Sequence, residues 1–226
     1  MPIIPSIILL VAAYLYGSVP FGFLFAKILR GVDIRQVGSG NIGATNAARV
    51  LGFRYFPVVF LLDFTKGFLP ALIASRLIVE GASYQPHPLA VCGALAAILG
   101  HVFPVYLKFK GGKAVAAGTG ACTILAPWAL LIAAGLWAVM FGIFRYVSLA
   151  SITAAAALGV STWIVYPHPL GSGLFRTAFC TLAGIFVIAL HHSNIRRLLR
   201  GTEHKIGHGR GEEDKEESRQ EDTGAE

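Results

Sequence analysis

The sequence predicts an all-α polytopic membrane protein with seven transmembrane helices. Of the 226 residues, 55% are hydrophobic and the mean hydropathy is +0.65, which is too apolar for a soluble domain. Seven apolar stretches approach the roughly 20 residues that a helix needs to cross a bilayer. Lys and Arg gather in every second loop, which is typical of alternating crossings. We therefore expect an outside N-terminus and a cytoplasmic C-terminus.

The first predicted span covers residues 3–28, and Gly17, Pro20 and Gly22 are expected to bend or open its second half. It runs longer than a signal-peptide core, so we interpret it as a retained helix. The fourth segment is short and is expected to be tilted or to cross only in part. The remaining predicted segments are 55–78, 89–107, 114–126 (the fourth), 128–144, 147–166 and 177–195.

Positive charge assigns the two sides of this bundle. The loops on one side, together with the segment after residue 195, hold nearly all the basic residues, including Lys27, Arg30, Arg35, Arg49, Arg54, Lys108, Lys110, Lys113 and Arg145. The other side has Glu80, with only Arg76 and Arg176 nearby. By the positive-inside rule, the basic side is cytoplasmic.

Charge also divides the chain into two parts. Residues 1–206 are predicted to form a single integral-membrane domain, and residues 207–226 a disordered, charged cytoplasmic tail. Before residue 212, seventeen Lys and Arg face only four acidic residues. This surplus favours anionic lipid headgroups or an anionic substrate. Nucleic acid is disfavoured, because the charges sit at the ends of apolar segments without an aromatic-rich basic domain.

A polar island at residues 38–49 lies between the first two spans. Three glycines let the backbone approach a ligand closely, namely Gly38, Gly40 and Gly43. Neutral hydrogen-bonding groups come from Ser39, Asn41, Thr45 and Asn46, and Arg49 supplies one cation. This inventory suits a phosphate. A glycine-rich reversal whose arginine merely marks the cytoplasmic side is an equally good interpretation of this stretch by itself.

Three further polar groups fall on the same side. Gly111 and Gly112 precede Lys113 at the start of a helix, which suits a phosphate cradle but lacks the spacing of a nucleotide P-loop. A membrane-exit turn would look similar. Ser148 either faces the same vestibule or bonds to its own helix backbone. His191, Asn194 and Arg197 recur at three-residue intervals and are expected to share one helix face.

Asp63 and Lys66 lie three residues apart within the second span and therefore on one helix face. Ionisable residues inside a membrane segment indicate a functional interior or an ion pair that stabilises packing. Cys92, Cys122 and Cys180 lack paired metal-ligand spacing and are interpreted as packing residues. His204 and His208 are interpreted as solvated tail residues.

Two enzyme classes are disfavoured by missing motifs. The chain lacks the paired aspartate-rich motifs of metal-dependent prenyl transferases and the G-x-S-x-G elbow of many hydrolases. A transporter or channel for a phosphorylated small anion stays open, favoured by the glycine-broken first segment and by Asp63 and Lys66. That class often shows an inverted repeat, which is not evident here.

Taken together, these motifs resemble one family, the bacterial acyl-phosphate-dependent glycerol-3-phosphate acyltransferases, over the chain up to about residue 206. The resemblance implies transfer of an acyl group from acyl phosphate to the sn-1 hydroxyl of glycerol-3-phosphate, forming lysophosphatidic acid for phospholipid synthesis. It rests on residues 18–22, 38–49 and 63–67, on Gly100, His101 and Pro104, on residues 109–113, and on His191, Asn194, Arg197, Gly201, Glu203 and Lys205.

The resemblance also implies roles for individual residues. The catalytic set is Ser39, Arg49, Lys113, His191 and Asn194. The substrate-binding set is Gly38, Gly40, Asn41, Thr45, Asn46, Lys66, His101, Gly111, Gly112, Ser148 and Arg197, while Asp63 and Glu203 are structural. Ala47, Ala114 and Ala117 depart from the residues usual in the family, with glycine usual at position 114.

The resemblance further implies no metal and no cofactor, contact with membrane lipid, a monomer, and a multi-pass location in the bacterial inner membrane with the active site facing the cytoplasm. Acyl phosphate is an activated mixed anhydride, so orientation and charge stabilisation can suffice without a covalent intermediate. His191 is a candidate base. A substrate phosphate could accept the proton instead.

Overall fold

The computed structural model describes residues 3–77, 86 and 88–206, and this part of the chain contains helices but no strands. The α-helices are α1 (Ile3–Ser18), α2 (Phe21–Arg30), α3 (Ala44–Leu51), α4 (Phe56–Arg76), α5 (Pro88–Val102), α6 (Val115–Leu125), α7 (Pro127–Phe144), α8 (Val147–Val165), α9 (Leu174–Leu190) and α10 (His192–Leu199). Three 3₁₀ turns are η1 (Ile34–Gln36), η2 (Phe53–Tyr55) and η3 (Val105–Leu107). The predicted tail at 207–226 lies outside the described residues.

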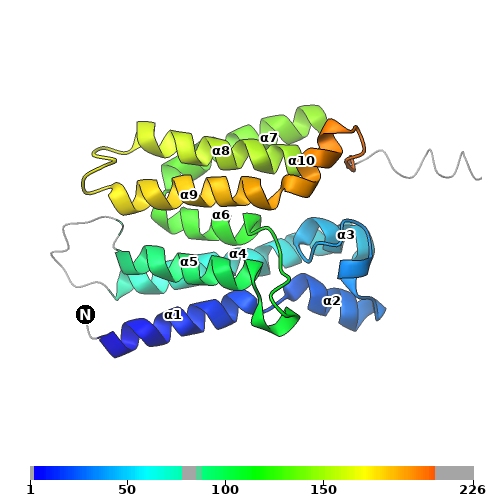
Figure 1. The fold of residues 1–226 in the computed structure, drawn as a ribbon, viewed down its shortest axis with the longest axis horizontal. Coiled ribbons are helices and arrows are strands. Elements are labelled where there is room, and N and C mark those ends of the chain that lie inside the picture. The colour runs from blue at the N-terminus through cyan, green and yellow to red at the C-terminus, as the bar shows by residue number, and fades with distance from the viewer. Residues whose placement is uncertain (1–2, 78–85, 87, 207–226) are drawn as a thin grey trace, which may run out of the picture.

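The long helices lie side by side in a layered bundle (Figure 1). Helix α1 packs on α5, α4 packs on both α5 and α6, and α8 packs on both α7 and α9. The shorter helices α2, α3 and α10 gather at one end of the bundle, and α1 starts at the opposite end (Figure 1). The polar segments that the sequence distributes along the chain therefore meet at one end.

Small residues allow the helices to approach closely. A Cβ atom at Gly67 would overlap the carbonyl oxygen of Ala117, and one at Gly120 would overlap that of Phe64, so α4 and α6 are in backbone contact. Helices α8 and α9 meet in the same way, because a Cβ atom at Gly184 would crowd the carbonyl of Ala155. Ala155 belongs to the alanine-rich stretch 154–157 of α8, whose small side chains permit this approach.

The prediction of an all-helical protein with several membrane-spanning helices is confirmed, but the predicted number of seven spans is not. Within the described residues, five segments are long and apolar enough to cross a membrane, namely Ile3–Arg30, Phe53–Arg76, Pro88–Leu107, Pro127–Phe144 and Val147–Val165. The α9–α10 pair would be a sixth if counted as one bent span. Helix α6 has 11 residues, or roughly 16 Å of helix, which is about half a hydrocarbon core.

Two helix boundaries, between α1 and α2 and between α9 and α10, change the chain direction next to polar segments. The predicted bend in the first segment is confirmed, because α1 ends at Ser18 and α2 begins at Phe21, after Pro20. The seventh predicted span, 177–195, is bent, because α9 ends at Leu190 and α10 leaves it at 56°. His191 lies at this hinge, so it does not share a regular helix face with Asn194 and Arg197.

Candidate active site

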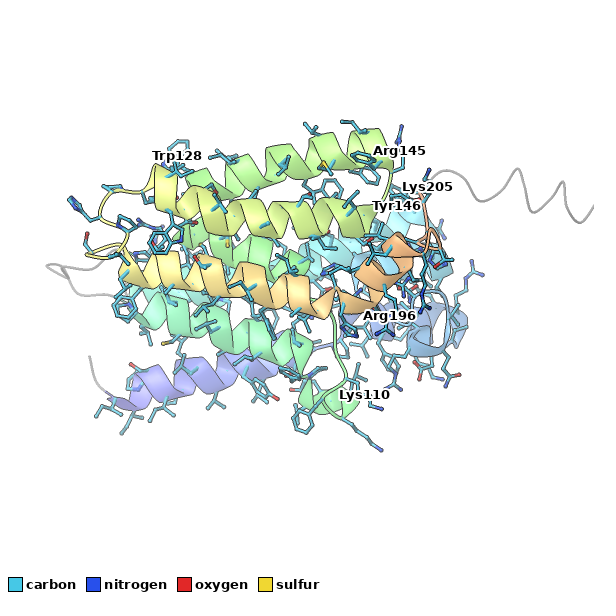
Figure 2. The ribbon with its side chains drawn as sticks, turned by 45° about the horizontal axis from the view of Figure 1, so that its top comes forward. Lys110, Trp128, Arg145, Tyr146, Arg196 and Lys205 are labelled. Atoms are coloured by element: carbon cyan, nitrogen blue, oxygen red, sulfur yellow. The ribbon has the colours of Figure 1, made fainter. Side chains whose placement is uncertain are left out.

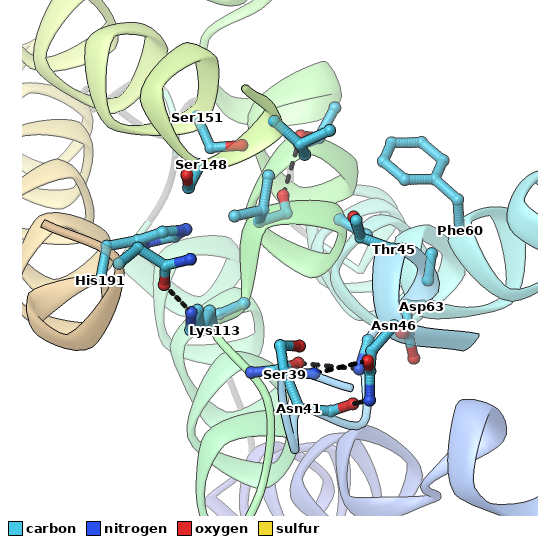
Figure 3. A pocket seen from close by; sticks show the side chains of 18 of the residues that line it. Ser39, Asn41, Thr45, Asn46, Phe60, Asp63, Lys113, Ser148, Ser151 and His191 are labelled. Atoms are coloured by element: carbon cyan, nitrogen blue, oxygen red, sulfur yellow. Dashed lines mark hydrogen bonds between the residues drawn. The ribbon is translucent and has the colours of Figure 1, made fainter. Parts of the chain in front are cut away.

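A cavity of about 380 Å³ opens among α3, α4, α6, α7, α8 and α10 (Figure 3). It collects side chains from every polar group that the sequence singled out. The predicted site residues that line it are Ser39, Asn41, Thr45, Asn46, Arg49, Asp63, His101, Lys113, Ser148, His191, Asn194 and Glu203. The others, Gly38, Gly40, Lys66, Gly111, Gly112 and Arg197, lie outside the lining.

Asn46 organises the island. Its amide nitrogen donates to the carbonyls of Ile34 (3.1 Å), Val37 (3.0 Å) and Asn41 (2.9 Å), and its oxygen accepts from the amide of Ser39 (2.9 Å). Because both ends of the buried side chain are occupied, Asn46 holds the loop in shape instead of offering groups to a ligand. Asn46 also lines the cavity, so its predicted role in substrate binding stays a prediction beside this structural role.

The loop turns through two glycines in left-handed conformations, Gly38 (φ +61°) and Gly40 (φ +69°). The second half of the island is helical, since α3 begins at Ala44 and carries Thr45 and Arg49. Within the described part of the chain, neither the Ser39 hydroxyl nor the exposed Arg49 guanidinium hydrogen-bonds another residue. These two groups are therefore available to a ligand in the cavity.

The Gly111–Gly112 turn packs against His101. The amide of Gly112 donates to the His101 carbonyl (3.0 Å), and a Cβ atom on Gly112 would overlap the imidazole. The next residues are Lys113, half-buried at the cavity, and Ala114, in the left-handed region at φ +58°. The turn thus aims the Lys113 ammonium into the cavity, where it donates to Oδ1 of Asn194 (Figure 3).

His101, which contacts this turn, also belongs to a buried network with Asp63 and Lys66. Lys66 Nζ is 2.6 Å from Asp63 Oδ1 and 3.3 Å from His101 Nδ1, and all three side chains are almost fully buried. The predicted shared face of Asp63 and Lys66 is confirmed. Lys66 was predicted to bind substrate, but its ammonium is enclosed by Asp63, His101 and the ring of Phe21, away from the cavity lining. Its contacts support the turn through His101.

Glu203 is the centre of a second network. One carboxylate oxygen accepts from Ser148 Oγ (2.8 Å) and Asn194 Nδ2 (2.7 Å), and the other accepts from Arg197 Nε (2.7 Å). Burial opposes ionisation, but these hydrogen bonds outweigh it and lower the pKa of Glu203. The carboxylate therefore ties α8 to α10 and orients Asn194, whose oxygen receives the Lys113 ammonium. Arg197 and Ser148 bind Glu203 here.

His191 presents one nitrogen as an acceptor. Its Nδ1 lies 2.7 Å from the carbonyl oxygen of Val187, and because that oxygen can only accept, Nδ1 carries the proton. In the neutral ring, Nε2 then keeps its lone pair. Since the ring lines the cavity (Figure 3), His191 can accept a proton there.

Positive charge dominates the polar end of the cavity. Burial, followed by the nearby charge of Arg197, lowers the pKa of Lys113 to about 8. Arg49, Lys113 and Arg197 interact electrostatically with one another and with the carboxylate of Glu203. No group of three His, Cys, Asp or Glu side chains suited to a metal ion occurs in residues 3–77, 86 and 88–206. The cations Arg49 and Lys113 at this end suit the binding of an anion.

The cavity also has an apolar side, which the sequence does not reveal. Phe56, Phe60 and Trp137 line it, and Trp137 Nε1 donates to Ser151 (3.2 Å). The stacked pair Phe56 and Phe60, four residues apart on α4, is a signal that sequence could have offered. His204, interpreted as a solvated tail residue, is exposed but lines the cavity. The cavity therefore suits an amphipathic ligand.

Comparisons with known proteins identify one family. The family model described as glycerol-3-phosphate acyltransferase matches residues 7–201. Curated proteins named glycerol-3-phosphate acyltransferase are similar, from Desulforamulus reducens (42% identity, covering 90% of this chain and 96% of that protein) and Aquifex aeolicus (44%; 89% and 99%).

Two solved structures share the fold. Both are crystal structures of PlsY (YgiH), described as an integral membrane glycerol 3-phosphate acyltransferase. The glycerol 3-phosphate form has a TM-score of 0.80 at 41% identity, and the lysophosphatidic acid form has a TM-score of 0.77 at 40% identity. Each match covers 90% of this chain and 96% of the PlsY chain.

Proposed function

The chain belongs to the glycerol-3-phosphate acyltransferase family, and we propose that it transfers a fatty acyl group from acyl phosphate to the sn-1 hydroxyl of glycerol-3-phosphate. The hydroxyl oxygen attacks the acyl carbon, the bond from that carbon to the phosphate oxygen breaks, and inorganic phosphate leaves. The hydroxyl proton passes to a base. The products are lysophosphatidic acid and phosphate, which place the reaction in phospholipid synthesis.

One observation carries this proposal. A single cavity joins a cationic, hydrogen-bonding end, formed by Ser39, Arg49 and Lys113, to an aromatic wall formed by Phe56, Phe60 and Trp137. Two anionic phosphates and a fatty chain need this combination, because the cations offset phosphate repulsion and the apolar wall accommodates the chain. We assign Ser39, Arg49 and Lys113 to the phosphates, with Asn41 and Thr45 as neutral partners.

The proton has two candidate acceptors. His191 offers Nε2 at the cavity, because its Nδ1–H is committed to Val187. The phosphate of glycerol-3-phosphate is the other acceptor and needs no protein base. Asn194, held by Glu203, positions Lys113. These side chains support direct transfer through orientation and preorganised charge, a type of stabilisation worth about 3–4 kcal/mol per donor.

We further propose that all seven segments predicted from the sequence traverse the membrane, including the short helix α6. The N-terminus would lie outside and the C-terminus in the cytoplasm. Lys110, Arg145, Arg196 and Lys205 lie toward the α10 end of the bundle, while Trp128 lies at the opposite end (Figure 2). The positive-inside rule favours a cytoplasmic α10 end and hence a cytoplasmic site in the inner membrane. We propose that the protein acts as a monomer embedded in lipid, without a metal or cofactor.

A reconstitution assay tests the function. Purified protein supplied with acyl phosphate and glycerol-3-phosphate is expected to form lysophosphatidic acid in proportion to protein. The competing transporter reading predicts uptake of glycerol-3-phosphate into proteoliposomes without product. Uptake with no lysophosphatidic acid from folded protein would overturn the enzyme assignment.

A further inference from the structure

The α10 end of the bundle carries four basic side chains, here named the basic rim: Arg145, Arg196, Arg200 and Lys205. All four residues are exposed. Arg145 precedes the cavity-lining residues Val147 and Ser148, and Lys205 follows the lining residues Glu203 and His204. Lys205 Nζ also lies 5.3 Å from the centre of the Tyr146 ring, so Lys205 lies close to the segment that contains Arg145 (Figure 2).

The rim lacks carboxylate partners within the described residues. The acidic residues in that part of the chain are Asp33, Asp63 and Glu203, and they pair with Arg35, Lys66 and Arg197. Four exposed cations are therefore left to solvent or to an anion from elsewhere. Such a cluster raises the local concentration of anions near the cavity.

The chain itself carries a complementary segment. Residues 207–226 hold eight acidic residues against three basic ones. The family match ends at residue 201, so this segment lies beyond the part that the match covers. Its attachment point is fixed at the rim, because the amide of Ile206 donates to the carbonyl of Arg145 (3.1 Å).

Length and charge together make contact feasible. If residues 207–226 are disordered, as their composition predicts, a chain of 20 residues has a root-mean-square reach of roughly 25 Å. The acidic run at Glu212–Glu217 begins only six residues beyond Ile206. Tethering also gives the segment a high effective concentration at the rim, of order millimolar. The cytoplasmic leaflet is itself anionic and repels an acidic segment.

We infer that the acidic segment 212–226 docks on the basic rim and competes with anionic substrate for entry to the cavity. This inference rests on the proposed function for its kinetic consequence, but not for the contact itself. The segment would then raise the apparent KM for glycerol-3-phosphate without changing kcat, because the cavity residues are untouched once substrate is bound. Salt would weaken the effect, since the charges involved are exposed.

The kinetic test uses the full chain with Glu212, Glu213, Glu216 and Glu217 changed to Gln and Asp214 changed to Asn. At about 0.01 M salt the variant is expected to show a KM for glycerol-3-phosphate lower by about fivefold, and at about 1 M salt no difference. A control variant, Ser218→Ala with Gln220→Ala and Thr223→Ala, is expected to match the parent. Equal KM values for the neutralised variant and the parent at low salt would overturn the competition.

A contact test works without turnover. Trypsin cleavage after Lys215 is followed by mass spectrometry in the full chain and in a rim variant with Arg145, Arg196, Arg200 and Lys205 changed to Gln. At low salt, cleavage is expected to be about fivefold slower in the parent than in the rim variant, with the free 207–226 peptide as the reference substrate. Equal rates would overturn docking. Anionic lipid bound to the rim in place of the acidic segment would also give equal rates. Slow cleavage in a protein without acyltransferase activity would uphold docking and reject the proposed function.

Discussion

At the scale of single residues, the site depends on a division between side chains that bind a ligand and side chains that hold other side chains. Composition alone does not make this division. Asn46 and Ser39 are both polar residues of one glycine-rich segment. The Asn46 amide hydrogen-bonds backbone groups of the loop, whereas the Ser39 hydroxyl stays available to a ligand. Lys66 and Lys113 differ in the same way, because only Lys113 lines the cavity.

Removing the available groups should abolish catalysis and leave the fold intact. Arg49→Ala and Ser39→Ala are each expected to lower kcat/KM by about 100-fold or more, the usual cost of a lost preorganised donor. Arg54→Ala, an exposed arginine outside the cavity lining, serves as the control. Thermal unfolding in detergent checks the fold, and unchanged turnover in both site variants would remove these residues from the site.

Lys113 should give the reaction a pH dependence. Because the pKa of Lys113 is lowered to about 8, the side chain is an ammonium below that pH and a neutral amine above it. The kcat/KM for glycerol-3-phosphate is therefore expected to fall as the pH rises through about 8. In Lys113→Arg the charge persists, so this decline should move to higher pH even if the maximum rate is reduced. Lys110→Arg is the matched control, and a decline that stays in place in Lys113→Arg would exclude Lys113 as its source.

At the scale of elements, the sequence predicted most helices well and their interruptions less well. Apolar length and flanking charge located the long helices, and Pro20 marked the break between α1 and α2. The hinge at His191 was missed because residues 177–195 contain no proline and keep a continuous apolar pattern up to Leu190. The network of Glu203, Ser148 and Asn194 that accompanies the hinge is a tertiary contact, which local pattern does not encode.

The turn before α6 contains a strained residue. Ala114 has a left-handed backbone (φ +58°), which costs a residue with a Cβ atom about 1 kcal/mol relative to glycine. Ala114→Gly is expected to raise the unfolding temperature in detergent. Ala116→Gly, within the regular helix α6, should lower it instead. Destabilisation by Ala114→Gly would contradict the strained turn.

The pair of Asp63 and Lys66 makes α4 sensitive to charge. Lys66→Met leaves a carboxylate buried without its cation and is expected to cost about 3–5 kcal/mol of folding free energy. The double variant Asp63→Asn with Lys66→Met should recover part of this loss, because neither charge remains. Denaturant unfolding in detergent measures both. If the double variant were no more stable than Lys66→Met, the ion pair would not account for the loss.

At the scale of the whole molecule, distant polar segments become one site because the bundle brings α2, α3, α10 and the α5–α6 turn to the same end (Figure 1). The sequence predicted this convergence through loop charge, since successive crossings return the basic loops to one side. It did not reveal the aromatic wall of Phe56, Phe60 and Trp137, because an apolar residue that faces a cavity has the same local pattern as one that faces lipid.

Donor choice tests the central claim, that this cavity performs acyl transfer from acyl phosphate to glycerol-3-phosphate. The measurement is quantification of lysophosphatidic acid and inorganic phosphate by purified protein, with acyl phosphate or acyl-CoA as the only donor. We predict equal amounts of both products from acyl phosphate and no lysophosphatidic acid from acyl-CoA. Equally efficient transfer from acyl-CoA, or release of phosphate without lysophosphatidic acid, would contradict the account.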